Sequence, residues 1–273
     1  MARSYSSILG LMVVLTVAAI AALAEPALAA DVNCSALRGD GHAVSSITQT
    51  ATIILDDGRE VGLAGVLLPL DEDSAALRAL VGPNGVDVAV AADSKTDRYG
   101  RSNAHVFVER SGERIWVQRA LVSEGHAIVS SRQAGLACLP ELLAAEETAR
   151  KEKRGLWANA AYRVHNATEP GALSRLRSHF VLVEGKVIST TERAGRLYLN
   201  FGGDWRTDFT VSVPKTLLTS ASDTRAKLTA LTGHTIRARG WIERRYGPAI
   251  EIYSLHDVED LTPATAAVSG SKP

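Results

Sequence analysis

Arg101 and the acidic run Asp71-Glu72-Asp73 are the side chains of this sequence whose types could hold an oxyanion or a hard metal ion. A fixed arginine can neutralise charge on an oxyanion, and carboxylates are the ligands that a hard cation such as calcium prefers. Each feature also has a structural interpretation. Arg101 could brace a hairpin beside Asp97 and Tyr99, and three acids before a helix could cap its N-terminus and complement its dipole.

Other classes of site lack their motifs. No Cys/His grouping has the spacing of a zinc site, and no Gly-rich turn stands between a strand and a helix as a nucleotide, flavin or nicotinamide cofactor requires. His105 and His126 are single histidines and indicate no catalytic dyad. The sequence therefore predicts no cofactor.

The elements predicted around Arg101 include both strands and helices. Asp57-Gly58 between two β-rich runs predicts a hairpin. The predicted strands are 51–55, 61–67, 86–90, 103–109 and 115–117, and the predicted helices are 73–80, 117–124 and 139–153.

The stretch from DRYGR at 97–101, through an apolar helix, to a last helix ending in Gly155-Leu156-Trp157 resembles the second half of the staphylococcal-nuclease (thermonuclease) family. The resemblance extends over about 115 residues, and its first half is recognisable mainly by register. It implies a five-stranded barrel of the OB type with three helices. It also implies calcium-dependent phosphodiester hydrolysis by two aspartates, a glutamate and two arginines.

When the family's catalytic positions are carried over to this sequence one by one, most of them fall on residues of other types. The metal aspartates fall on Ala51 and Leu67, the glutamate on Leu70 and the first arginine on Gly62, so that only the second arginine is present, as Arg101. Loss of a single preorganised donor typically costs about 100- to 1,000-fold in rate. We therefore expect the phosphodiesterase chemistry to be absent and the domain to act as a binding or scaffold module.

An alternative keeps catalysis. A shift of the loop after Pro69 could bring Glu72 near the old site, where it would work with Arg101. The protein would then be a residual or altered nuclease with calcium as its cofactor.

The second part of the chain predicts three strands, a helix and two strands, which is the order of an OB fold. The expected elements are strands 180–188, 196–201 and 208–213, a helix at 221–231, and strands 235–242 and 249–253. Alternation places Tyr198, Arg237, Arg239 and Trp241 on outward faces. Such a basic and aromatic surface could stack the bases of single-stranded nucleic acid, bind an envelope protein or glycan, or be a structural exterior.

The N-terminus is typical of a secretory signal peptide over residues 1–29, with Arg3, an apolar run and Ala27-Leu28-Ala29 before the cleavage point. The alternative is a retained anchor, although a spanning helix needs about 20 apolar residues. No later run is long enough to cross a bilayer. We expect a periplasmic or secreted protein with no membrane span after cleavage.

Cys34 and Cys138 are the two cysteines of the sequence. An even count in an exported protein favours a disulfide over two buried thiols.

The charge is divided unevenly. Residues 31–157 carry 14 Lys and Arg against 18 Asp and Glu, whereas residues 158–261 carry 14 against 11. Nucleic-acid-binding surfaces are strongly basic, so the first region is poorly charged for that role. The layout predicted is a β-rich α+β protein of two OB-type five-stranded barrels: a thermonuclease-like domain at 30–160, a linker at 161–174, an OB-like domain at 175–262 and a disordered tail at 263–273.

Overall fold

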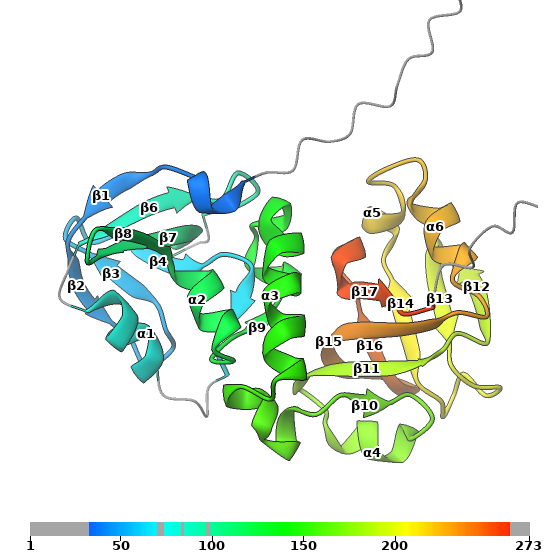
Figure 1. Ribbon diagram of the computed structural model, residues 1–273. Helices are drawn as coiled ribbons and strands as arrows, with labels where there is room; N and C mark the ends of the chain where they lie inside the picture. The colour runs from blue at the N-terminus through cyan, green and yellow to red at the C-terminus, as the bar shows by residue number, and fades with distance from the viewer. Residues whose placement is uncertain (1–32, 70–73, 83–84, 97–98, 263–273) are drawn as a thin grey trace, which may run out of the picture. The chain divides into compact units, whose positions relative to one another are not determined.

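The computed structural model describes residues 33–69, 74–82, 85–96 and 99–262 (Figure 1). The predicted signal peptide and tail, Leu70, the acidic run 71–73 and Asp97 lie outside these residues. We call residues 33–160 the N-terminal region and residues 161–262 the C-terminal region.

The N-terminal region contains the following elements: η1 Cys34–Ala36, β1 Asp40–His42, β2 Val44–Ile47, β3 Ile53–Leu55, β4 Glu60–Leu63, β5 Val66–Leu67, α1 Ala75–Val81, β6 Val86–Val90, β7 Ser102–Arg110, β8 Glu113–Trp116, α2 Val117–Ser123, β9 Ile128–Val129, η2 Ser131–Gln133, η3 Leu136–Cys138, α3 Leu139–Lys151 and η4 Gly155–Ala158, with η5 Ala160–Tyr162 at its end.

The C-terminal region contains β10 His165–Asn166, α4 Pro170–Arg175, β11 Phe180–Lys186, β12 Ser189–Arg193, β13 Arg196–Asn200, β14 Thr210–Val213, α5 Lys215–Leu218, α6 Thr224–Ala230, β15 Thr235–Arg245, β16 Gly247–Glu251, η6 Leu255–Asp257 and β17 Val258–Asp260. Every strand and helix predicted in either region has a counterpart here with ends shifted by a few residues, except that the predicted strand 61–67 is divided into β4 and β5.

The first sheet has the order β1-β6-β7-β4-β3-β2, and β8 pairs with β7. The predicted hairpin is confirmed, since β3 pairs antiparallel with β4 across the Asp57-Gly58 turn. A parallel pairing that the sequence did not predict joins β4 to β7, with Gly62 opposite Asn103. This pairing sets the segment after Gly100 beside the strand that carries Gly62.

The helices of the N-terminal region bury one face each. The buried positions of α3 are Leu139, Leu142, Glu146 and Ala149, a spacing that follows the helical repeat. On α2, Gln118 is fully buried, and its amide accepts from the Val106 N–H (3.1 Å) and donates to the Ala104 carbonyl (2.7 Å). The glutamine thereby fastens α2 to β7.

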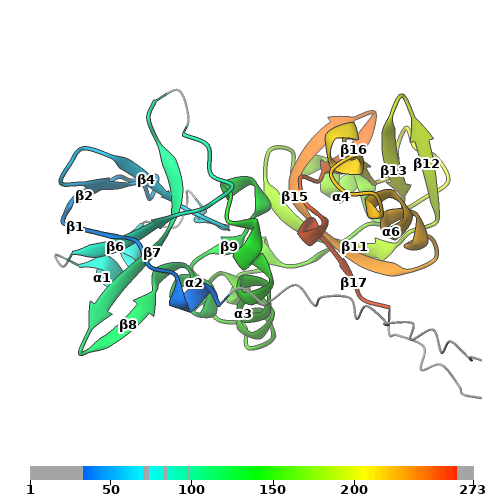
Figure 2. The ribbon, with the colours of Figure 1, turned by 90° about the horizontal axis from the view of Figure 1, so that it is seen from above.

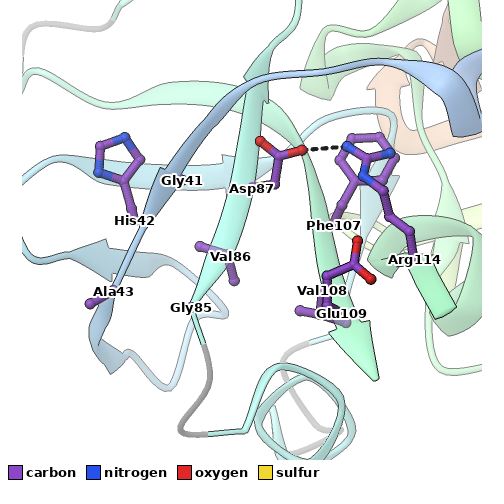
Figure 3. A pocket seen from close by; sticks show the side chains of 10 residues that line it. All are labelled: Gly41, His42, Ala43, Gly85, Val86, Asp87, Phe107, Val108, Glu109 and Arg114. Carbon is purple, nitrogen blue, oxygen red and sulfur yellow. Dashed lines mark hydrogen bonds and ion pairs between the residues drawn. The ribbon is translucent and has the colours of Figure 1, made fainter. Parts of the chain in front are cut away.

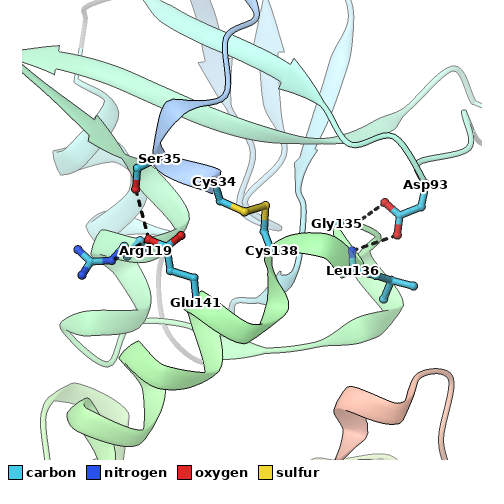
Figure 4. The surroundings of a disulfide bond; sticks show 8 residues. All are labelled: Cys34, Ser35, Asp93, Arg119, Gly135, Leu136, Cys138 and Glu141. Atoms are coloured by element: carbon cyan, nitrogen blue, oxygen red, sulfur yellow. Dashed lines mark hydrogen bonds and ion pairs between the residues drawn. A yellow bond between two sulfur atoms is a disulfide. The ribbon is translucent and has the colours of Figure 1, made fainter. Parts of the chain in front are cut away.

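The predicted disulfide is confirmed. Cys34 and Cys138 are joined with a Cα–Cα distance of 5.8 Å across 104 residues of sequence (Figure 4). Closing a loop of that length is worth at most about 4.7 kcal/mol in the chain-entropy model. Next to the bridge, the Asp93 carboxylate accepts from the Gly135 N–H (2.6 Å) and the Leu136 N–H (3.1 Å). These bonds hold the loop before β7 against the start of η3.

The second sheet has the order β10-β11-β15-β16-β14-β13-β12, and β17 pairs with β15. β15 is long and bends in the view of Figure 2: its first part pairs with β11 and its last part with β16. Gly240 lies at the change of partner, where a Cβ would meet Ile250 Cγ2 at 2.6 Å. A strand with glycine at such a bend can pass from one set of partners to another.

The segment predicted as a linker, 161–174, contains β10, which pairs parallel with β11, and most of α4, with Leu173 fully buried. Two five-stranded barrels are not confirmed, because pairing among the described strands gives open sheets of seven and eight strands.

Within the described ranges, no helix combines the length and apolar character needed to cross a membrane.

Candidate functional site

One cavity of about 310 Å³ collects the positions carried over from the family register. Ala51, Gly62, Leu67 and Arg101 all line it. The remaining lining residues are Thr50, Thr52, Leu63, Val66, Leu68, Lys95, Ser102, Asn103 and Gln133. Residues from β4, β5, β7 and three connecting segments therefore meet at one place.

Ala51 occupies a tight turn before β3. Its φ is +59°, which favours glycine, asparagine or aspartate over alanine. The turn is closed by Thr48, whose N–H donates to the Thr52 carbonyl (2.9 Å) and whose Oγ1 accepts from the Thr52 N–H (3.0 Å). The side chain that this turn brings to the cavity is a methyl group.

Gly62 faces a side chain that fills its space. A Cβ at this position would lie 2.4 Å from Asn103 Oδ1, because β4 and β7 are paired there. An arginine at Gly62 would need Asn103 to move. The neighbour that faces Gly62 in the cavity wall is therefore a neutral amide.

Leu67 forms the apolar wall of the cavity. It is half-buried on β5, which pairs with β9 so that Leu67 lies opposite Ile128. Among the described lining residues there is no carboxylate, whereas calcium takes about six to eight oxygen ligands with carboxylates prominent among them. This part of the wall does not fit a calcium ion.

Lys95 and Arg101 give the cavity its charge. Both are exposed, and the Arg101 guanidinium lies over the Tyr99 ring, 5.1 Å from its centroid. The Lys95 loop is held to β7, since Ser94 Oγ accepts from the Asn103 N–H (2.8 Å). Two cations beside the amides of Asn103 and Gln133 form a wall suited to an oxyanion.

His105 lies in the core and takes no part in the cavity wall. It is buried on β7 with its ring 5.4 Å from that of Trp116. Burial lowers the pKa of His105 to about 4, and the nearby Asp93 carboxylate only partly opposes that effect. The imidazole is therefore neutral at pH 7. Its strand, β7, lies inside the first sheet and is paired with β6 and β4.

The prediction that Arg237 and Arg239 face outward is wrong. Arg239 is 2% exposed and pairs with Glu146 (2.8 Å) and Glu259 (2.7 Å), while its Nη1 also donates to the Val129 carbonyl (3.2 Å). Arg237 pairs with Glu184 (2.6 Å), Glu259 (3.1 Å) and Glu147 (3.2 Å). The alternation of β15 is as predicted, but carboxylates from α3 and β17 cover its second face.

The same burial sets the ionisation of this network. Burial disfavours the charge on Arg239, but Glu146 and Glu259 outweigh it and hold its pKa above the usual value. Burial likewise disfavours the Glu259 carboxylate, but Arg239, Arg237 and Arg150 outweigh it and hold its pKa below the usual value. Both guanidinium groups are committed to the protein's own carboxylates.

Tyr198 and Trp241, the other two predicted ligand-binding residues, are half-buried. The Trp241 ring packs edge-on against Phe180, with centroids 5.9 Å apart. Since the two arginines are buried, the structure does not unite the four residues in one exposed surface.

A second cavity of about 390 Å³ lies along β1, β6 and β7 (Figure 3). Its arginine, Arg114, lies 3.6 Å from the Phe107 ring centroid and pairs with Asp87 at 2.5 Å. Arg114 also donates to the Ser35 and Leu37 carbonyls. The guanidinium is used in tying η1 to the sheet.

One side-chain group in the described ranges has ligand atoms close enough to hold a metal ion. It consists of His42, Asp56 and Asp57, with those atoms within 4.8 Å of one another. Arg59 pairs with Asp57 (2.7 Å) and also contacts the His42 ring. The protein's own cation therefore lies inside this exposed group.

Sequence reasoning missed Lys95, Asn103 and Gln133 as members of the cavity. Lys95 comes from the loop before β7 and Gln133 from the short helix η2, and Asn103 is placed by the parallel pairing of β4 with β7. Neither motif nor alternation signals such positions.

A comparison with family models matches residues 71–159 to the family described as staphylococcal nuclease homologue. The match begins after the segments that carry Ala51, Gly62 and Leu67, and it includes Arg101. No curated protein matches the chain.

Proposed function

We propose that this protein is an exported, non-catalytic member of the thermonuclease-like proteins that binds a phosphate-bearing ligand through the cavity at Arg101. The supporting observation is that Lys95 and Arg101 line one cavity with Ala51, Gly62 and Leu67, and that no carboxylate is among its described lining residues. The match of residues 71–159 to the nuclease family supports the origin of the fold. The disulfide supports an oxidising compartment, the periplasm or the exterior.

The chemistry of the wall favours binding over hydrolysis. Hydrolysis of a phosphodiester needs an activated water and stabilisation of the charge that develops on the phosphoryl oxygens. Lys95 and Arg101 can supply the second requirement. The described wall has no carboxylate to hold a metal or to activate a water, so it supplies no means for the activation of water.

The test is a pair of measurements on the mature chain. Degradation of single- and double-stranded DNA is followed with and without calcium, and binding of inorganic phosphate and of a deoxynucleoside monophosphate is followed by calorimetry. We expect no cleavage, no calcium-induced thermal shift, and ligand binding that weakens about tenfold or more in Arg101→Ala, because a charged hydrogen bond is lost.

Arg193→Ala provides the control, because Arg193 is an exposed arginine on β12 outside the cavity. Calcium-dependent cleavage abolished by Arg101→Ala would overturn the proposal and support the nuclease in which Glu72 acts with Arg101. Equal phosphate affinity in Arg101→Ala and the parent would show that the cavity is not the binding site, leaving an envelope protein or glycan as the partner class.

A further inference from the structure

An exposed aromatic pair stands at one end of the second sheet. Trp205, in the segment between β13 and β14, is 41% exposed, and Tyr246, between β15 and β16, is 70% exposed. Their ring centroids are 4.6 Å apart at an interplanar angle of 80°, and the Arg206 guanidinium lies 4.5 Å from the Trp205 centroid. Large aromatic rings usually bury most of their surface, so rings clustered in solvent indicate a recognition surface.

The segment that carries Trp205 is fixed by its own hydrogen bonds. Asp208 Oδ2 accepts from the Asp204 N–H (2.8 Å), and Asp204 Oδ1 accepts from the Arg206 N–H (2.9 Å). The Asp208 N–H also donates to the Asp204 carbonyl (2.8 Å). Because these bonds order the turn before any ligand arrives, binding there costs little conformational entropy.

The two segments also pack directly on each other. A Cβ at Gly247 would lie 2.5 Å from the Asp208 carbonyl oxygen, so the turn around Asp208 rests against the start of β16. Tyr246, the residue before this glycine, has φ +71°, a conformation that an aromatic residue adopts at a cost of about 1–3 kcal/mol. The chain thus holds a tyrosine ring in solvent where the backbone alone would favour glycine.

The charge around the pair favours an anionic ligand. Arg206, which lies over the Trp205 ring, and Arg244, two residues before Tyr246 in the sequence, are both exposed. The acids of the turn, Asp204 and Asp208, direct carboxylate oxygens to backbone N–H groups. Arg245 is engaged by Glu251 at 2.5 Å. Arg237 and Arg239 on β15 are buried, whereas Arg206 and Arg244 keep their guanidinium groups at the surface.

We propose that Trp205, Arg206, Arg244 and Tyr246 form a binding site for single-stranded nucleic acid, with a base stacked on the exposed Tyr246 ring and the two arginines facing phosphates. Proteins that bind single strands combine aromatic stacking with cationic contacts to the backbone. A neutral glycan could stack on the same rings and accept hydrogen bonds from the arginines, but it carries no negative charge to pair with them. The site is independent of the cavity at Arg101.

The experiment measures binding of a fluorescein-labelled oligothymidine of about 15 nucleotides to the full mature chain by anisotropy, at several salt concentrations. Tyr246→Ala is expected to weaken binding roughly 5- to 150-fold, the loss measured for one stacked base. Tyr246→Phe keeps the ring and is expected to bind like the parent. Arg206→Ala is expected to reduce the slope of log affinity against log salt by about 0.7.

Tyr253→Ala is the matched control, because Tyr253 is also 40% exposed and lies under an arginine, Arg132, at 4.3 Å, away from the pair. Trp205→Ala provides a second variant on a different segment if Tyr246→Ala fails to fold.

Loss of oligothymidine binding in Arg101→Ala, with no loss in the aromatic variants, would place binding in the cavity and overturn this inference. Binding of a neutral polysaccharide in place of the oligonucleotide would also overturn it. Retained binding in Arg101→Ala with loss in Tyr246→Ala would support it whether or not the cavity binds phosphate.

Discussion

His105 shows how a single buried residue sets a pH dependence. Its ring is neutral inside the sheet, and burial has lowered its pKa from the ordinary 6.5 to about 4. Between these values the unfolded chain binds a proton that the folded chain does not, so stability rises with pH across this interval. The contribution is fully present above pH 6.5 and is lost as the pH falls toward 4.

We therefore predict that lowering the pH from about 7 to about 4.5 costs roughly 2 kcal/mol of unfolding free energy through His105 alone. The measurement is urea denaturation at both pH values for the parent and for His105→Gln. The variant should lose less stability on acidification by about that amount. An NMR titration that places the His105 midpoint near 6.5 would contradict the prediction.

At the scale of the element, β15 depends on Gly240. The strand exchanges β11 for β16 beside this glycine, and the absent Cβ leaves room for the buried Ile250 side chain. The bend lets one strand serve two sets of partners. It also places Ile242 and Ile250 opposite each other within the core of the C-terminal region.

Gly240→Ala is expected to destabilise the protein by about 1–3 kcal/mol, because the added methyl would overlap Ile250 Cγ2 in a packed core. Denaturant unfolding monitored by tryptophan fluorescence measures the change. Gly203→Ala, where a Cβ would meet no atom within 4 Å, should remain within about 0.5 kcal/mol of the parent. Equal costs for the two variants would show that the bend does not require glycine.

At the scale of the whole molecule, the network around Arg239 links elements far apart in the sequence. Glu146 comes from α3, Arg239 from β15 and Glu259 from β17, and both Arg239 and Glu146 are almost fully buried. Removing one member of a buried ion pair leaves an uncompensated charge in a poorly solvated site.

Arg239→Met is accordingly expected to cost about 3–5 kcal/mol of unfolding free energy. Arg225→Met, which removes an arginine from an exposed pair with Glu192, should cost about 0–1 kcal/mol. Thermal and denaturant unfolding compare the two. A cost for Arg239→Met no larger than that for Arg225→Met would show that the buried network adds nothing to stability.

Much of the fold could be predicted from local patterns. Asp57-Gly58 fixed a hairpin, glycines marked the ends of α2 and α3, and alternation identified the buried faces of β13 and β15. The carried-over positions Ala51, Gly62, Leu67 and Arg101 were identified by register, and they do meet at one cavity. These features depend on short spacings, which the sequence expresses directly.

By itself, then, the sequence determined most of the elements and the pairing of Cys34 with Cys138. Only the tertiary structure decided which polar groups remain in contact with water. Arg239 was predicted to face outward because alternation reports two faces of a strand but not what covers each, and carboxylates from α3 and β17 cover this one. Trp205 and Tyr246 gave no signal, since only long-range packing brings two turns together.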